Sequence, residues 1–214
     1  MKPGNSLWLS AIFLLSLLAA FVWLRPQMPA LVATHWNAQG QINGHMTPIN
    51  AIATPIVVIA LLALLTWLLP RISPRRYEIR PFASAFGAVM LAAQAFIWVA
   101  ALGVLLNAAG HPVRMPLLCM ISLGALLIVM GNYMGKLRQN FFAGIRTPWT
   151  LASKTVWERT HRLGGWIFVL AGLMTIVIAL VQAPFWLMFC VIAAAVLIPY
   201  VYSYVIYRRV EQRA

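Results

Sequence analysis

Six uncharged apolar stretches follow one another along the chain, separated by polar segments that contain proline, glycine or arginine. Most of them approach or exceed the roughly 18 to 20 residues that a helix needs to cross the hydrocarbon core of a bilayer. The pattern therefore predicts an all-α integral membrane protein with six transmembrane helices. The predicted spans are residues 7–24, 49–69, 82–108, 116–134, 163–181 and 184–207.

The composition supports this interpretation. Hydrophobic residues make up 63% of the 214 residues and charged residues only 9%, whereas about a quarter of the residues in a soluble domain are charged. A chain of this kind cannot bury its apolar surface in one water-soluble core. The lipid bilayer is therefore the expected solvent for most of it, and we expect a multi-pass protein of the bacterial cytoplasmic (inner) membrane.

Basic residues fall almost entirely on one side of the predicted bundle. Of the 16 Lys and Arg residues, only Arg25 and Arg114 lie in segments on the other side. Short basic segments stay in the cytoplasm, which predicts that both termini are inside. The net charge of +13 follows from this sorting, and without zinc-finger spacing or a soluble basic domain no nucleic-acid partner is predicted. The basic residues on the predicted inner side are Lys2, Arg71, Arg75, Arg76, Arg80, Lys136, Arg138, Arg146, Lys154, Arg159, Arg162, Arg208, Arg209 and Arg213.

Acidic residues are too few and too scattered to suggest catalysis. The chain has no Asp, and Glu78, Glu158 and Glu211 lie outside the predicted spans, which contain no ionisable Lys, Arg or His either. Proton-coupled transporters and channels place such groups in the membrane. Membrane hydrolases need paired carboxylates, an activated nucleophile or a zinc-binding helix. We therefore expect no enzyme and no cofactor.

Cysteine and histidine suggest no metal centre. Cys119 and Cys190 both lie in predicted spans, where small apolar packing is the expected role and a disulfide or metal site the lesser alternative. His35 and His45 share the first outer segment, but two histidines without acids or thiols make a poor ligand set. No metal is predicted.

The outer segment 25–48 has a composition too particular for a simple connector. Prolines at 26, 29 and 48 and glycines at 40 and 44 exclude a long helix and favour turns. Between them lie His35, Trp36 and Asn37, with Trp36 suited to the membrane interface. Two interpretations stay open, an interface-anchored connector and a surface that recognises something arriving from outside.

The inner segment 131–165 is the longest polar connection. Thr155 and Glu158 form a T-x-x-E pattern that predicts a short amphipathic helix from about 151 to 163. Arg146 lies between Gly144 and Pro148, so its planar guanidinium would be held on a constrained segment, suited to carbonyl or phosphate oxygens. Lipid-phosphate anchoring and docking of a partner are the alternatives for these cations. In the short helix Val156, Trp157 and Leu163 are expected to face the membrane or the bundle, and Lys154, Arg159 and Arg162 to face water.

Particular motifs in both segments resemble a known family. Residues 144–151 read Gly-Ile-Arg-Thr-Pro-Trp-Thr-Leu, preceded by Gly-Asn-Tyr at 131–133 and followed by Val-Trp at 156–157 and Thr-His-Arg-Leu-Gly at 160–164. This set resembles the signature of the Sdp immunity-protein family of bacterial membrane proteins. Pro29, Thr-His-Trp-Asn at 34–37 and Gly40 resemble the domain of unknown function 1648 that often precedes it.

The resemblance implies a protein that protects the producing cell from a secreted peptide toxin and that signals by holding a cytoplasmic regulator at the membrane. It implies an amino-terminal hairpin over 1–70 and a four-helix membrane region over 71–214. The expected outer recognition residues are His35, Trp36 and Asn37. The expected inner functional residues are Asn132, Asn140, Gly144, Arg146, Thr147, Pro148, Trp149, Trp157, Thr160, His161 and Arg162.

A transporter of small molecules or lipids is the alternative function. Transport would require a wet cavity within the membrane, and Gln94 and Asn107 are the polar residues best placed in the spans to line one. Blocking a toxin would need only the outer segment and helix surfaces. The position of these two side chains therefore distinguishes the two functions.

Overall fold

Six long helices make up most of the protein in a computed structural model that describes residues 3–37, 39–74 and 78–212. All six are long and apolar enough to cross a membrane, which confirms the predicted number within this part of the chain. They are α1 (Pro3–Leu24), α2 (Pro48–Ile72), α3 (Ala83–Ala108), α4 (Met115–Met134), α6 (Lys154–Leu180) and α7 (Trp186–Glu211). The shorter elements are α5 (Pro148–Ala152), the 3-10 turns η1 (Arg25–Gln27) and η3 (Arg80–Phe82), and the strands β1 (Val32–Trp36) and β2 (Ile42–Met46).

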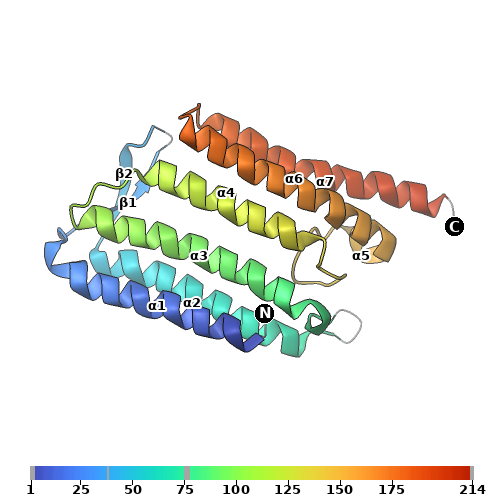
Figure 1. Cartoon of the computed structure of the whole chain (residues 1–214), viewed down its shortest axis with the longest axis horizontal. Coiled ribbons are helices and arrows are strands. Elements are labelled where there is room, and N and C mark those ends of the chain that lie inside the picture. Colours follow the sequence, from blue (N-terminus) through green and yellow to red (C-terminus); the bar gives the residue numbers. More distant parts are fainter. Residues whose placement is uncertain (1–2, 38, 75–77, 213–214) are drawn as a thin grey trace.

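The helices run alternately up and down between two ends of the bundle (Figure 1). One end, the hairpin end, holds strands β1 and β2 and the connections from α3 to α4 and from α6 to α7. The other, the terminal end, holds the start of α1, the end of α7 and the connections from α2 to α3 and from α4 to α6. Helices α1 to α3 form one group and α4, α6 and α7 a second, with α3 packed against α4 between them.

The two ends differ in charge as the sequence predicts. Arg25 and Arg114 lie at the hairpin end, and the other described basic residues lie at the terminal end. Whether the terminal end faces the cytoplasm stays a prediction, as does the division at residues 70 and 71. Four basic residues of the predicted inner side, Lys2, Arg75, Arg76 and Arg213, lie outside the described residues.

Much of the helix surface is apolar and exposed, as a lipid-facing surface should be. Exposed leucine, isoleucine and valine side chains cover α1, α2, α6 and α7. Trp8 and Trp23 are exposed toward opposite ends of α1, Trp67 near the end of α2 and Trp186 at the start of α7. Such positions place the indole rings near the two membrane interfaces.

Glycines bring α4 and α6 close together. A Cβ atom added at Gly131 would lie 2.5 Å from the carbonyl oxygen of Gly165, and one added at Gly124 would lie 2.7 Å from that of Gly172. Gly124 and Gly131 are seven residues apart on α4, as Gly165 and Gly172 are on α6, so both contacts fall on one face of each helix. Close backbone approach between small residues is a usual way to join helices in lipid. Gly124 and Gly131 are therefore packing residues of the contact between α4 and α6.

The start of α6 differs from the prediction. A separate helix over 151–163 capped by Thr155 was expected, but α6 begins at Lys154 and continues unbroken to Leu180. The reason is that the Ser153 side chain accepts a hydrogen bond from Val156 N and caps the helix two residues earlier. The predicted faces hold: Val156 and Trp157 are buried, whereas the three basic residues Lys154, Arg159 and Arg162 are exposed.

The predicted turn-rich outer segment contains a β-hairpin, which the sequence pattern did not reveal. Strands β1 and β2 pair antiparallel, with an irregular register around His35. Val32 is buried among residues of α1, α2 and α3 and anchors the hairpin to the first helix group. The turn contains Gly40, whose φ of +77° suits glycine, and a Cβ added there would lie 3.6 Å from Cγ of Pro116 at the start of α4. The hairpin therefore spans both helix groups.

Candidate functional site

The inner connection between α4 and α6, residues 135–153, is folded by its own side chains. Asn140 is completely buried and forms four hydrogen bonds. Its Oδ1 accepts from the backbone N–H groups of Phe142 and Ala143 at 2.8 and 2.7 Å. Its Nδ2 donates to the carbonyls of Arg138 and Ala143 at 2.8 and 3.0 Å. An amide side chain that is saturated in this way fixes a turn, and it has no remaining capacity for a ligand.

A threonine pair ties the loop to α7. The Thr147 side chain accepts from Thr150 N, and the Thr150 side chain accepts from Thr147 N, which forms a reciprocal cap at the start of α5. Thr147 Oγ1 also lies 3.1 Å from Ser203 Oγ of α7. Pro148 occupies the first turn of α5, where proline is favoured. Trp149 packs beside Tyr200 and Tyr204, with ring centroids 5.8 and 5.0 Å apart.

His161 closes the other side of this loop. Its Nδ1 donates to the carbonyl of Trp157 at 2.9 Å, and its Nε2 accepts from Ile145 N at 3.0 Å. This pair of bonds requires the neutral ring with its proton on Nδ1. The imidazole stacks on the Trp157 indole with centroids 4.0 Å apart. Both ring nitrogens of His161 therefore make structural hydrogen bonds.

Gly144 is the point at which the loop touches this histidine. Its φ is +105°, and an added Cβ would lie 2.3 Å from His161 Nε2. Any side chain would therefore displace the imidazole from the Ile145 amide. Glycine is needed here for both the backbone conformation and the close approach.

The remaining predicted inner residues divide between buried and exposed positions. Trp157 is buried, and its Nε1 donates to the Leu137 carbonyl at 2.7 Å. Thr160 is buried without a hydrogen-bond partner for its hydroxyl among the described residues. Arg162 is exposed on α6. Asn132 is exposed on α4 and donates to the Ile128 carbonyl, so it does not join the loop network.

Arg146 lies on the surface of this folded loop. Its side chain is exposed and donates one hydrogen bond to the Phe141 carbonyl. The guanidinium is thus held in place from one side, as the sequence predicted, while its other donors are open to the surroundings. It is not desolvated within the chain. Exposed cations close to it in sequence or on α6 are Lys136, Arg138, Arg159 and Arg162.

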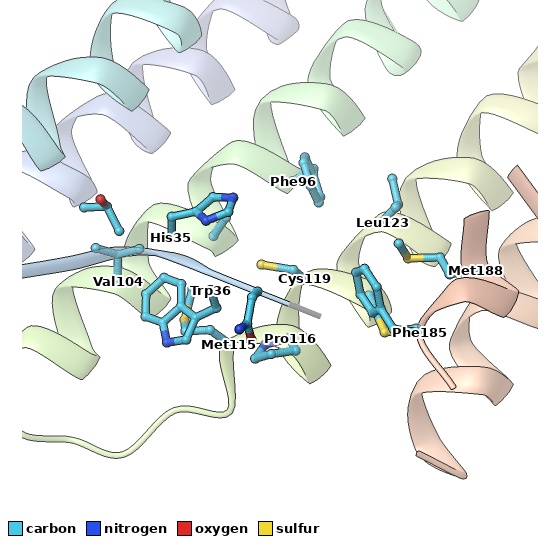
Figure 2. Close-up of a pocket in the computed structure, with 14 residues that line it drawn as sticks. His35, Trp36, Phe96, Val104, Met115, Pro116, Cys119, Leu123, Phe185 and Met188 are labelled. Carbon is cyan, nitrogen blue, oxygen red and sulfur yellow. The ribbon is translucent and has the colours of Figure 1, made fainter. Parts of the chain in front are cut away.

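At the hairpin end, the three predicted outer residues do lie together beside a cavity of about 280 Å³ (Figure 2). His35, Trp36 and Asn37 border it from the hairpin, and Phe185 and Met188 from the start of α7. The rest of the lining is mostly apolar. It consists of Thr34 of β1, Phe96, Ala100 and Val104 of α3, and Met115, Pro116, Cys119, Met120 and Leu123 of α4.

The three outer residues have different local roles. His35 Nδ1 donates to the amide oxygen of Asn43 on β2, and the His35 side chain is exposed. Asn37 Oδ1 accepts from the backbone N–H groups of Gln39 and Gln41, which holds the hairpin turn. The Trp36 side chain has no hydrogen-bond partner among the described residues, and it borders a second cavity of about 610 Å³ as well as the first. Trp36 is therefore the member of the set best placed to contact a ligand.

The two residues that would favour transport are far apart, and of the two side-chain amides only that of Asn107 has a hydrogen-bond partner among the described residues. Gln94 is completely buried in the middle of α3, and Asn107 donates to the Val113 carbonyl at 3.2 Å near the end of the same helix. Thirteen residues of helix separate them by about 20 Å. Neither lines the two cavities at the hairpin end. They do not form the shared wet cavity that the transport alternative requires.

Comparison with known proteins finds two matching regions, one towards each end of the chain. Residues 136–203 match the SdpI/YfhL protein family, and residues 11–60 match a domain of unknown function, DUF1648. The chain carries an SdpI-type region. Immunity protein SdpI of Bacillus subtilis (strain 168) is 29% identical over 117 residues, which are 54% of this chain and 56% of that relative. The match thus spans about half the length of the relative, and no solved structure matches the chain.

The SdpI-type region contains the folded inner loop and most of α7. Among the predicted inner residues only Asn132 lies outside it, while His35, Trp36 and Asn37 lie inside the DUF1648 region. The six apolar helices and this relationship identify a multi-pass protein of the bacterial cytoplasmic membrane.

Sequence reasoning missed several residues that complete these sites. Gln139 Nε2 donates to the carbonyls of Thr150 and Leu151 at 2.8 and 2.7 Å. Ser203 of α7 forms the hydrogen bond with Thr147 that joins the loop to this helix. Arg114 borders the larger hairpin-end cavity. The only signal for Ser203 was its position as a polar residue within a predicted span, and nothing local marked its partner 56 residues away.

Proposed function

We propose that this protein is a membrane immunity protein that protects its cell against a secreted peptide toxin. The observation that carries the proposal is the SdpI-type region together with the similarity to a relative named as an immunity protein. The same relationship favours a binding protein over an enzyme. The chemistry of the spans agrees, because the predicted spans offer no carboxylate or histidine for acid–base work.

The hairpin end is the proposed side of contact with the toxin. The hairpin end has only two of the Lys and Arg residues, and the terminal end has the others. Under the positive-inside rule this difference supports an extracellular position for the hairpin end. Trp36 and the apolar cavity beside it offer a place for hydrophobic side chains of an incoming peptide. Hydrophobic anchors that enter such pockets usually supply most of the affinity of a complex.

The terminal end is the proposed side of contact with a cytoplasmic regulator. The inner loop is held rigid by Asn140, Thr147 and His161, and it presents Arg146 at its surface. A guanidinium fixed on a loop whose sequence also carries the exposed Lys136 and Arg138 suits an acidic protein surface. Signalling through this face is the second part of the proposal, and the Arg146 variants described in the Discussion test whether the same face contributes to protection.

A survival assay tests the recognition surface. A strain that depends on this protein for resistance is challenged with peptide toxins of related bacteria while expressing His35→Ala with Trp36→Ala. Protection should fall by tenfold or more at equal membrane expression. The matched control is His45→Ala with Ile42→Ala, because these exposed residues share the hairpin but line neither cavity. Asn37 is left unchanged because it holds the turn. Full protection by the first variant would reduce the hairpin to a connector.

Topology reporters test the orientation on which this assignment rests. An enzyme that is active only outside the cytoplasm, fused after Ala108, should give a strong signal, and the same enzyme fused after Arg80 should give none. The sign follows from the charge difference between the ends. A reversed pattern would place the inner loop outside and remove the hairpin from contact with an external toxin.

A further inference from the structure

The two cavities at the hairpin end adjoin each other. Both are open to the outside of the chain, and they share Trp36, Met115, Pro116, Met120 and Phe185 in their walls. The smaller cavity lies between α3, α4 and the start of α7, beneath the first strand of the hairpin (Figure 2). The larger one lies at the helix ends, where Arg114 precedes α4 and Gln182 follows α6.

The two parts differ in polarity along the helix axes. Phe96, Ala100 and Val104 stand at successive turns on one face of α3, so the apolar part extends about 12 Å into the bundle. Opposite them are Cys119 and Leu123 of α4. The part at the helix ends contains the exposed side chains of Gln39, Arg114 and Gln182. A molecule that fits both parts is apolar along the membrane normal and polar at its outer end.

We propose that this site binds one anionic phospholipid of the leaflet at the hairpin end. One acyl chain occupies the apolar part between α3 and α4, and the headgroup phosphate lies at Arg114. The direction of the cavity favours a lipid as the occupant. The apolar part extends along the helices from the helix ends, and an acyl chain likewise runs along the membrane normal from its headgroup. Arg114 supplies charge complementarity at that level, since Gln39 and Gln182 of the rim are uncharged amides.

The size of the apolar part agrees with such an occupant. An apolar cavity of about 150 Å³ in another protein holds a benzene molecule, and the volume here is about 280 Å³. The walls include the flexible side chains of Met115, Met120 and Met188, which adapt to an acyl chain of variable shape. The proposal concerns the protein without toxin, so it stands or falls independently of the proposed immunity function.

Lipid binding to the purified full chain tests the charge. Delipidated protein in detergent is titrated with phosphatidylglycerol or with phosphatidylcholine of the same acyl chains, and native mass spectrometry counts bound lipids. Phosphatidylglycerol should bind first and about fivefold or more tightly, and Arg114→Gln should remove that preference. Arg25→Gln is the matched control, since Arg25 is the other basic residue of this end and lines neither cavity. Equal binding of the two lipids by the unchanged protein, or equal losses in the two variants, would overturn the proposal.

The two cysteines test the position of the acyl chain without any substitution. Cys119 lines the apolar part, whereas Cys190 is exposed on α7 outside it. Phosphatidylglycerol should slow the reaction of Cys119 with N-ethylmaleimide at least threefold relative to Cys190, as measured by peptide mass spectrometry. Stronger protection of Cys119 than of Cys190 would support an acyl chain in the apolar part of the cavity. Equal protection of both thiols would mean that the lipid only surrounds the protein, and would overturn it.

A space-filling variant completes the test. Ala100→Trp should occupy the apolar part and weaken binding of phosphatidylglycerol at least fivefold, whereas Ala60→Trp on the exposed face of α2 should leave binding unchanged. Both variants are first compared with the unchanged protein by size-exclusion chromatography and thermal unfolding. If Ala100→Trp does not fold, the comparison of Cys119 with Cys190 decides alone. Unchanged binding by a folded Ala100→Trp variant would exclude the acyl chain from this cavity.

Discussion

The terminal end and the hairpin end use polar residues in opposite ways. In the inner loop the buried polar side chains of Asn140, Thr147 and His161 are satisfied by each other or by the backbone. At the hairpin end, polar side chains of Trp36, Arg114 and Gln182 border open cavities. The inner loop, which contains the longer sequence motif, is therefore a fixed structure. The open cavities lie instead at the hairpin end, where the motif is shorter.

This difference changes the meaning of the inner motif. Gly144, Thr147, Trp157 and His161 shape the loop, so substitutions there should act first on stability. Arg146 is the exposed residue that the shaped loop presents. If the comparison is right, stability and protection should respond separately along this short segment. The three predictions below test it in order of expected effect on stability.

The largest effect is expected at Gly144. In Gly144→Ala the new Cβ would meet His161 Nε2 at 2.3 Å, and the backbone would keep a φ of +105° that a side chain disfavours. Strain and the lost hydrogen bond should together cost about 3 kcal/mol or more. The thermal unfolding midpoint of the purified protein in detergent measures it. Gly135→Ala is the matched control, because nothing lies within 4 Å of its added Cβ and its φ is −67°. Equal midpoints for the two variants would contradict the contact.

A smaller effect is expected at His161. In His161→Phe the ring can still stack on Trp157, but the backbone N–H of Ile145 loses its acceptor. An unpaired donor of this kind costs about 1 to 3 kcal/mol. The unfolding midpoint should fall, and hydrogen exchange should speed up at Ile145. Trp166→Phe on the exposed face of the same helix serves as the control and should leave both unchanged. Slow exchange at Ile145 in His161→Phe would show that the histidine does not hold the loop.

The sequence was a good guide to the helices and a partial one to the sites. Hydropathy predicts six spans because each helix must present an apolar surface to lipid on its own, without help from distant residues. The start of α6 was missed because Ser153, and not Thr155, provides the cap. The hairpin was missed because its short strands lack an alternating apolar pattern, and the residues of β2 are mostly exposed.

The roles of individual site residues depend on contacts with residues far away in the sequence, and a local sequence pattern does not predict such contacts. The sequence correctly brought His35, Trp36 and Asn37 together, because they are neighbours in the chain. It did not predict the cavity beside them, whose walls come from α3, α4 and the start of α7. The bonds from Thr147 to Ser203 and from Trp157 to Leu137 likewise join distant segments. Such contacts follow from tertiary packing. A sequence motif can show that its residues matter, but it does not name their distant partners.

The smallest effect on stability, and the sharpest one on function, is expected at Arg146. The side chain is exposed and bonds only to the Phe141 carbonyl among the hydrogen bonds described for it, so Arg146→Ala should leave the unfolding midpoint nearly unchanged. Its planar group is nevertheless fixed by the loop, and an ammonium cannot reproduce its fork of donors. If this face contributes to protection, Arg146→Lys should then protect nearly as poorly as Arg146→Ala at equal expression. Full protection by the lysine variant alone would reduce the role to positive charge, and full protection by both would remove Arg146 from the mechanism.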